Sequence, residues 1–231
     1  MSLLECKNLS KYYSGKCALD HIDLTIERGR IVGLLGPNGS GKSTLIKLIS
    51  GLLKQSDGEL TVSGHQIGIE TKKIVSYLPD RDYLNDYMKV EDIVTMFQEF
   101  YEDFDKQRAM DMIAKLNIDA KEPLKNLSKG TKEKVQLILV MSRHASLYLL
   151  DEPIGGVDPA ARDYILNTII SNYEENATVI IATHLIADIE QVLDEVIFIN
   201  QGKIALQSTV DEIREQNGKS VDSLFREVYR C

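Results

Sequence analysis

The chain has 231 residues, of which 43% are hydrophobic and 27% charged, a balance typical of a globular protein with a substantial core. Its 27 basic and 35 acidic side chains give a net charge of −8, which argues weakly against a nucleic-acid-binding surface. No apolar run approaches the roughly 18 residues that a membrane-spanning helix needs.

The amino-terminal residues lack the basic segment and long apolar run of a secretory signal peptide, so we expect none. Cys6, Cys17 and Cys231 are scattered along the chain and odd in number, which fits reduced thiols in a cytoplasm. Together these features predict a cytosolic chain.

The first elements predicted along the chain are two short strands, at residues 3–8 and 22–26. A polar loop is predicted between them, at residues 11–16.

A glycine-rich loop at residues 36–44, Gly-Pro-Asn-Gly-Ser-Gly-Lys-Ser-Thr, carries the strongest signal in the chain. It follows an apolar run at residues 31–35 and leads into a helical pattern that begins at Leu45. Strand, glycine-rich loop and helix form the setting in which this pattern binds phosphate. Its glycines allow consecutive N–H groups to point into one concavity, and the helix adds its free amides. The sequence therefore predicts a nucleotide site.

Two side chains of this loop have specific expected roles. Lys42 is predicted to reach the β- and γ-phosphates, and the Ser43 hydroxyl is predicted to ligate Mg²⁺. ATP and Mg²⁺ are therefore the expected cofactors. The residues assigned to nucleotide binding are Gly36, Pro37, Asn38, Gly39, Ser40, Gly41, Lys42, Ser43 and Thr44.

The segment after the first helix changes character twice. Leu60 and Val62 alternate with polar residues and predict a third short strand, so we expect an antiparallel sheet beside the nucleotide-binding core. A further strand is predicted at residues 74–78. Residues 86–144 then show only helical patterns, with Asp105 and Ser128 as expected helix N-caps. We interpret them as a helical subdomain inserted into an α/β chain.

Strands and helices alternate again in the last third of the chain. Residues 147–150 form a continuous apolar run, as expected for a parallel strand that is buried on both faces. The other predicted elements are a helix from Pro159 to Tyr173 capped by Asp158, a strand at 178–182, a helix at 185–193, a strand at 195–199 and two short terminal helices.

Two adjacent carboxylates, Asp151 and Glu152, follow the apolar strand at residues 147–150. The carboxyl ends of strands beside a phosphate loop are where α/β proteins bind ligands. Because neighbouring strand residues face opposite ways, the two carboxylates can have different roles. One can hold Mg²⁺ through water, and the other can polarise the water that attacks the γ-phosphate.

Five motifs, in order, resemble the ATPase subunit of an ATP-binding-cassette (ABC) transporter, and the resemblance runs nearly end to end. They are the loop at 36–44, the signature-like Leu127–Thr131, the strand ending in Asp151 and Glu152, the D-loop-like Gly156–Asp158, and Thr183-His184. The resemblance implies a single domain over residues 1–231, with a P-loop NTPase RecA-like core. An antiparallel β subdomain and a helical subdomain inserted at about 86–144 complete this α/β fold.

The resemblance also implies individual roles. It makes Glu152 the general base, Asp151 the ligand of a Mg²⁺-bound water, and His184 the γ-phosphate sensor. Glu152, His184 and Lys42 are the expected catalytic residues. Tyr13 matches the aromatic residue that stacks on adenine, although Tyr12 stays open as the alternative.

The chain departs from the family pattern at three positions. Lys129 and Thr131 replace the usual glycine and glutamine of the signature. Ser128 and Gly130 remain, and they supply a hydroxyl and an open amide at a helix N-terminus. Asp80 stands where the family carries the Q-loop glutamine, and its carboxylate could still meet Mg²⁺ or the attacking water through a bridging water.

The expected function is hydrolysis of ATP to ADP and phosphate in a homo- or heterodimer with a second ABC ATPase subunit. The dimer would drive a separate integral membrane permease, with the chain peripheral on the inner face of the cell membrane and without nucleic acid. The Lys129 variant favours an exporter. The alternative is a soluble ABC-type ATPase that acts on a nucleoprotein or assembly complex. A small-molecule kinase is disfavoured, because the signature and His184 would then have no purpose.

Overall fold

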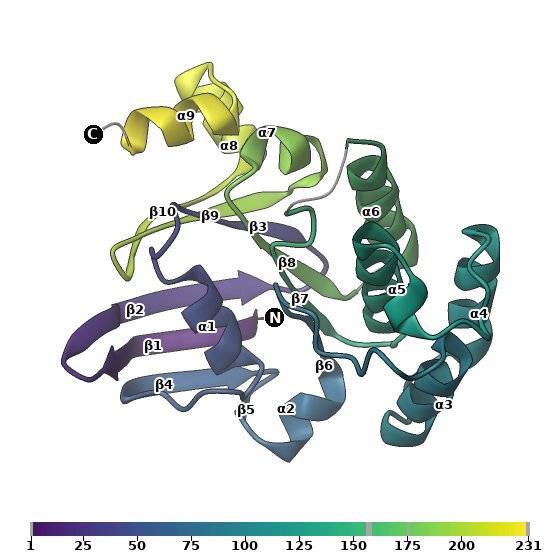
Figure 1. The fold of residues 1–231 in the computed structure, drawn as a ribbon. Coiled ribbons are helices and arrows are strands. Elements are labelled where there is room, and N and C mark those ends of the chain that lie inside the picture. The colour runs from purple at the N-terminus through teal and green to yellow at the C-terminus, as the bar shows by residue number, and fades with distance from the viewer. Residues whose placement is uncertain (1, 156–158, 175, 230–231) are drawn as a thin grey trace.

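The computed structural model describes residues 2–155, 159–174 and 176–229 of the chain. Two β-sheets organise this part of the chain (Figure 1). The first sheet is antiparallel and has the strand order β2-β1-β4-β5. Its strands are β1 (Ser2–Tyr13), β2 (Lys16–Glu27), β4 (Asp57–Val62) and β5 (His65–Gln66). The predicted antiparallel sheet is therefore confirmed.

The β1–β2 hairpin is longer than the sequence predicted. Lys11–Tyr13 belong to β1 rather than to a loop, and Tyr13 pairs with Lys16 across a two-residue turn. Both turn residues, Ser14 and Gly15, have positive φ angles of 43° and 85°, as tight hairpin turns require. The polar composition of residues 11–16 thus reflects a hairpin tip exposed to solvent.

The second sheet is parallel except at one edge, and its strand order is β10-β9-β3-β8-β7-β6. Its strands are β3 (Ile31–Leu35), β6 (Val75–Leu78), β7 (Leu147–Asp151), β8 (Thr178–Thr183), β9 (Glu195–Asn200) and β10 (Lys203–Thr209). Every residue of β3, β7 and β8 is buried, which confirms the interpretation of the continuous apolar runs. The edge strand β10 was not predicted. None of its residues is fully buried, and only Ile204, Ala205 and Leu206 are apolar, so its apolar signal is weak.

The helices agree with the predicted helical patterns, apart from α2. They are α1 (Lys42–Ile49), α2 (Ile69–Ile74), α3 (Val90–Phe100), α4 (Lys106–Lys115), α5 (Lys129–Met141), α6 (Pro159–Asn172), α7 (Ile186–Ile189), α8 (Val210–Asn217) and α9 (Val221–Val228), with short 3₁₀ turns η1 (Leu124–Asn126) and η2 (Glu190–Val192). Asp105 and Ser128 cap α4 and α5 as predicted. The predicted cap Asp158 lies outside the described residues. Among the described helices, none has the length and apolar character that crossing a membrane requires.

The parallel sheet separates two apolar cores. On one face, Leu34 and its neighbours pack against α1 and the antiparallel sheet. On the other face, Leu35 and its neighbours pack against α5, α6 and α7. The strands therefore hold α1 and the loop before it at a fixed place at the carboxyl edge of the sheet.

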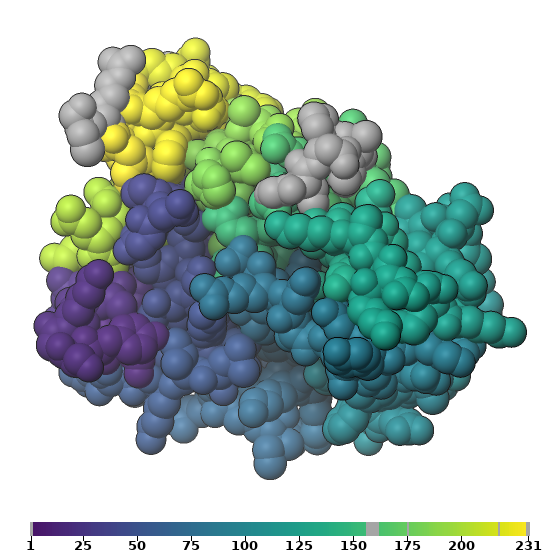
Figure 2. Space-filling model, in the orientation of Figure 1, coloured from purple at the N-terminus to yellow at the C-terminus, as the bar shows by residue number. Residues whose placement is uncertain are grey.

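The helices α3, α4 and α5 follow β6 and precede β7, so they form one long crossover between adjacent parallel strands. They share a third apolar core that includes Val94, Ile113 and Leu139. Figure 1 places this helical block beside the sheet, and Figure 2 shows its teal residues next to the blue residues of the preceding part of the chain. Helix α5 also contributes to the core under the sheet, so it joins the block to the core.

Candidate active site

The glycine-rich loop lies between β3 and α1, tightly packed against β2 and β9. A Cβ atom on Gly36 would lie 2.3 Å from the carbonyl oxygen of Ile199. A Cβ atom on Gly41 would lie 2.9 Å from the carbonyl oxygen of Ala18, and the φ angle of Gly41 is +118°. Glycine is therefore required at both positions for the loop to follow this path.

The rest of the loop leaves its open side to solvent. Pro37, Asn38 and Gly39 are exposed, whereas the hydroxyl of Ser40 is buried and has no hydrogen-bond partner among the described residues. Helix α1, which includes Ser43 and Thr44, has no side-chain N-cap and no acidic residue in its first turn. Its free amides are thus available to an anion.

Lys42 is buried inside the curve of the loop. Its Nζ donates to the carbonyl oxygens of Gly36 at 2.7 Å and Pro37 at 3.3 Å, and lies 3.9 Å from Oε1 of Glu152. Burial lowers the pKa of Lys42, while the carboxylates of Glu152 and Asp151 oppose that shift. The ammonium group is held where a bound phosphate would be attracted to it.

Ser43 and Asp151 meet at the carboxyl end of β7. The Ser43 hydroxyl donates to Oδ1 of Asp151 at 3.0 Å, and Asp151 is only 2% exposed. Burial raises the pKa of Asp151, with added repulsion from Asp80 and Glu152, while the hydrogen bond from Ser43 opposes the rise. A buried carboxylate beside a hydroxyl is an oxygen donor set that suits Mg²⁺.

The protein atoms supply only part of such a coordination shell. Among the described residues, no group of three or more His, Cys, Asp or Glu side chains could hold a metal ion. This arrangement fits Mg²⁺ in phosphate-transfer sites, where one or two protein ligands act together with waters and substrate phosphates. Ser43 and Asp151 would hold the ion in this chain.

Glu152 occupies a strained backbone position and is fixed by two side chains from the end of β8. Its φ angle is +53°, in the left-handed region that non-glycine residues rarely adopt. The Thr183 hydroxyl donates to Oε2 at 2.9 Å, and His184 Nδ1 lies 3.0 Å from Oε1. The hydrogen bond from Thr183 to Glu152 was not predicted, because the sequence shows only that Thr183 precedes His184.

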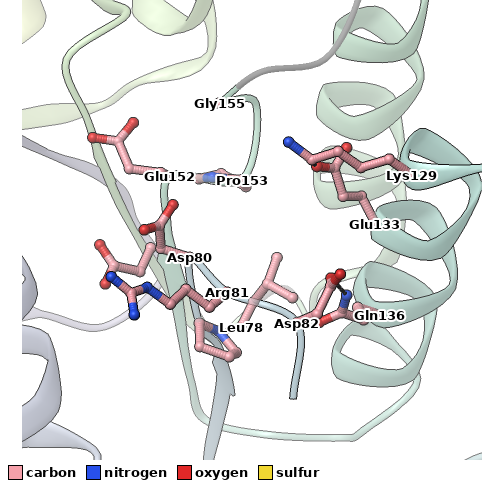
Figure 3. Close-up of a pocket in the computed structure, with 12 residues that line it drawn as sticks. Leu78, Asp80, Arg81, Asp82, Lys129, Glu133, Gln136, Glu152, Pro153 and Gly155 are labelled. Atoms are coloured by element: carbon pink, nitrogen blue, oxygen red, sulfur yellow. Dashed lines mark hydrogen bonds and ion pairs between the residues drawn. The ribbon is translucent and has the colours of Figure 1, made fainter. Parts of the chain in front are cut away.

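Asp80 borders a pocket beside these carboxylates (Figure 3). Asp151 and Glu152 line the same pocket, and Lys129 and Gln136 of α5 lie across from them. Burial raises the pKa of Tyr77 to about 12, with further contributions from Asp151 and Asp80, so these two carboxylates share one electrostatic environment. The structure thus brings Asp80 to the site, while its role toward Mg²⁺ stays a prediction.

Ser128 and Gly130 do not line this pocket. The Ser128 hydroxyl accepts the N–H of Thr131 at 3.2 Å, and a Cβ atom on Gly130 would meet open space. The α5 N-terminus is therefore accessible, but it belongs to the helical block rather than to the phosphate loop. The D-loop-like residues 156–158 lie outside the described residues.

Tyr13 lies at the end of β1, on the hairpin whose second strand packs against the phosphate loop at Gly41. Tyr12 and Tyr13 are 43% and 41% exposed, and neighbouring strand residues point to opposite faces. Exposure alone does not distinguish which ring would stack on a base, so the assignment of Tyr13 stays a prediction.

Comparison with known proteins identifies the family. The family model described as "ABC transporter" matches residues 19–155. The match begins in β2 and ends three residues after Glu152. The chain belongs to the ABC transporter family. It is accordingly an ABC-type ATPase that binds ATP, which confirms the resemblance seen in the motifs.

Curated relatives match almost the whole chain. The SkfA peptide export ATP-binding protein SkfE of Bacillus subtilis is 30% identical over 222 residues, which cover 94% of this chain and 93% of the relative. The lantibiotic transport ATP-binding protein SrtF of Streptococcus pyogenes is 29% identical, with 90% of this chain and 92% of the relative covered. The linearmycin resistance ATP-binding protein LnrL of Bacillus subtilis is 30% identical, with 96% and 74% covered.

Solved structures agree with this assignment. The structure described as the ATP binding subunit of an ABC transporter superposes with a TM-score of 0.89 at 29% identity, and covers 99% of this chain and 100% of its own. A nucleotide-free ATP-binding cassette superposes with a TM-score of 0.78 at 21% identity, which supports the fold alone. The predicted fold class, an α/β P-loop NTPase core with an antiparallel sheet and a helical insert, is confirmed.

Proposed function

We propose that the chain hydrolyses ATP with Glu152 as the general base and, as one half of a dimer closed around ATP, powers a separate membrane permease for export. The observation that carries this proposal is the position of the Glu152 carboxylate. It accepts a hydrogen bond from Thr183, contacts His184, and lies 3.9 Å from the buried Lys42 ammonium.

Each side chain has a separate task in this mechanism. Lys42 and the free amides of α1 bind the phosphates. Ser43 and Asp151 would hold Mg²⁺, which would supply positive charge to the phosphate oxygens. Glu152 accepts a proton from the attacking water. His184 contacts Glu152, and the Glu152 carboxylate lies 3.9 Å from the Lys42 ammonium. His184 is therefore close enough to the phosphate-binding lysine to respond to the presence of the γ-phosphate.

The proposed dimer is supported by the position of the α5 N-terminus, which is on the helical block and not on the phosphate loop. Ser128 and Gly130 offer an anion site, yet they do not line the pocket of Asp151 and Glu152, which the α5 N-terminus borders through Lys129. A second copy, or a related subunit, arranged head to tail would bring each α5 N-terminus to the partner's ATP. One interface then completes two sites.

Export and a permease partner are supported by the relatives, whose names describe peptide export, lantibiotic transport and linearmycin resistance ATP-binding proteins. A groove between α1, β6 and α3 is a suitable surface for the permease. Leu52 and Tyr83 are exposed there, and Phe97 and Tyr101 form its apolar wall. Pro79 lines both this groove and the pocket of Asp80, so the groove adjoins the nucleotide site.

The test compares Glu152→Gln with Lys42→Ala, using Glu174→Gln as a control on a surface carboxylate. Glu152→Gln should bind ATP with nearly normal affinity and lose turnover, because only the base is removed. Lys42→Ala should lose affinity and turnover together. Near-normal turnover in Glu152→Gln would remove Glu152 from the mechanism. Purification with a polytopic membrane protein would support the permease, whereas purification with a nucleoprotein or assembly complex would favour the alternative function.

A further inference from the structure

The loop at residues 79–89, which connects β6 to α3, is attached to α5 by two side-chain contacts. Gln136 Nε2 donates to Oδ1 of Asp82 at 2.5 Å, as Figure 3 shows, and Lys132 Nζ lies 2.7 Å from Oδ1 of Asp86. Residues 132 and 136 are one helical turn apart, so both contacts lie on the same face of α5.

The two halves of this loop are held differently. Its second half is bonded to the segment before α5, because Lys125 N–H donates to the Asp86 carbonyl and Leu124 N–H donates to the Met88 carbonyl. The first half of the loop contains Asp80 and Arg81. Among the described residues, neither of their side chains forms a hydrogen bond or an ion pair. The contact between Asp82 and Gln136 is thus the side-chain anchor nearest to Asp80, two residues away.

Burial makes this contact costly to break. Gln136 is only 4% exposed, and its amide donates to a carboxylate, which gives a charge-assisted hydrogen bond. If the loop moved away, the amide would be left buried and unpaired, which is unfavourable. Gln136 therefore restricts the position of Asp82, and through it the position of Asp80 opposite Asp151 and Glu152.

We propose that Gln136 is a positioning residue for ATP hydrolysis, which holds the loop so that Asp80 faces the Mg²⁺ site. This inference rests on the proposed function and deepens it. Helix α5 also carries Ser128 and Gly130 in its cap and first turn. The contact therefore links the loop of Asp80 to the helix that carries the anion site of the same chain.

The test uses Gln136→Met, which keeps the volume of the side chain and removes the amide. Its matched control is Gln107→Met, since Gln107 also donates to an aspartate, Asp111, but on the exposed face of α4. Gln136→Met should lower kcat about tenfold, the effect expected from one lost hydrogen bond, and change KM little. Gln107→Met should match the wild type.

A second readout does not depend on turnover. Calorimetry of ATP binding, with Mg²⁺ titrated at fixed nucleotide, should show that Gln136→Met needs about tenfold more Mg²⁺ for the same enhancement of affinity. Binding of ATP in chelator should stay within about twofold of the wild type. In an Asp80→Ala background, Gln136→Met should cause no further change in either quantity, because it acts through Asp80.

The inference fails if Gln136→Met behaves like Gln107→Met, or if its effect adds fully to that of Asp80→Ala. If Gln136→Met does not fold, the pair Asp82→Asn and Asp82→Ala decides the question. Asp82→Asn keeps an acceptor for the amide and should be milder than Asp82→Ala, and equal behaviour of the two would overturn the inference. An active Glu152→Gln would instead contradict the proposed function itself.

Discussion

The hydroxyl of Ser43 donates a 3.0 Å hydrogen bond to the carboxylate of Asp151, although 108 residues separate them in the chain. Asp151 is buried, and no ion pair to it is found among the described residues. Burial disfavours the charged form of Asp151, and the hydroxyl of Ser43 opposes that effect. This contact joins the phosphate loop to the strand that leads into the two carboxylates of the candidate site.

Ser43→Ala should remove this stabilisation. Without Mg²⁺ and nucleotide, the free energy of unfolding should fall by about 1–3 kcal/mol, because a buried carboxylate loses its donor. The Mg²⁺ concentration that supports half-maximal ATP hydrolysis should rise. Ser50→Ala is the control, since the Ser50 hydroxyl bonds only the Lys47 carbonyl at the exposed end of the same helix. Equal melting curves and equal Mg²⁺ dependence for both variants would contradict the assignment.

The two tyrosines of the hairpin tip give a second prediction. If Tyr13 stacks on adenine, Tyr13→Ala should weaken ATP and ADP by the same factor, equivalent to about 1–3 kcal/mol, because stacking does not sense the phosphates. Tyr13→Phe should have a mild effect. Titration of both nucleotides by calorimetry checks this, with Tyr12→Ala measured in parallel. A larger effect of Tyr12→Ala would assign the adenine contact to Tyr12.

The motifs of the site could be predicted from the sequence because each is local. The phosphate loop needs Gly36 and Gly41 for steric reasons, and the apolar run of β7 stops at Asp151. Such constraints leave a readable pattern in a few neighbouring residues. The caps Asp105 and Ser128 were predicted for the same reason.

Contacts between distant segments could not be predicted. Thr183 reaches Glu152, and Gln136 reaches Asp82, only after the sheet order and the path of the crossover are known. Strand β10 was missed because an edge strand with alternate exposed residues has little apolar signal. Helix α2 is only six residues long, too short for a helical period to emerge.

Glu133 gives a prediction for pH dependence. Its Oε2 is buried without a partner among the described residues, and burial raises the pKa of Glu133 above its usual value of 4.5, with Lys129 opposing and Asp82 adding to the shift. Because the pKa of Glu133 is higher in the folded state, its contribution to the free energy of unfolding is fully present below pH 4.5. That contribution is lost as the pH rises through the pKa of the folded state.

Glu133→Gln should therefore stabilise the protein only above that pH range. At pH 7.5 the gain should be at most about 1 kcal/mol, because Glu133 is partly solvated, and the melting temperature should rise by at most ~2–4 °C. At pH 4 the gain should vanish, since Glu133 is then largely neutral in both states. The exposed Glu215→Gln serves as control. A gain of the same size at both pH values would show that ionisation of Glu133 is not its cause.

The apolar groove gives a prediction for coupling to the permease. Leu52 is 62% exposed in a groove that also contains the cations Lys47 and Lys72, so we expect an amphipathic, acidic segment of the permease to bind there. Leu52→Glu should abolish stimulation of ATP hydrolysis by the permease and leave the basal rate of the isolated chain unchanged. Ile170→Glu, at another exposed apolar position, is the control. Full stimulation of Leu52→Glu would exclude the groove as the permease surface.

The final prediction concerns the dimer that would complete the ATP site. Ser128 caps α5 at the exposed start of the helix and does not line the pocket of Asp151 and Glu152, so we expect its hydroxyl to meet a phosphate bound to another chain. Glu152→Gln should accumulate as a dimer with Mg-ATP and stay monomeric with ADP, because the γ-phosphate is retained only in the first case. Adding Ser128→Arg should keep ATP binding to the monomer, since Lys42 is unchanged, and should prevent dimerisation by steric clash.

Light scattering coupled to size-exclusion chromatography measures both outcomes directly. Ser128→Arg in the otherwise wild-type chain should lose hydrolysis, whereas Lys115→Arg at the end of α4 should retain it. If the functional assembly is a heterodimer, the related subunit must be mixed in before the comparison, and the ATP-dependent shift should then appear in the mixture alone. Normal turnover by a monomeric Ser128→Arg protein would rule out the composite site, because a second chain would then contribute nothing to the chemistry at Glu152.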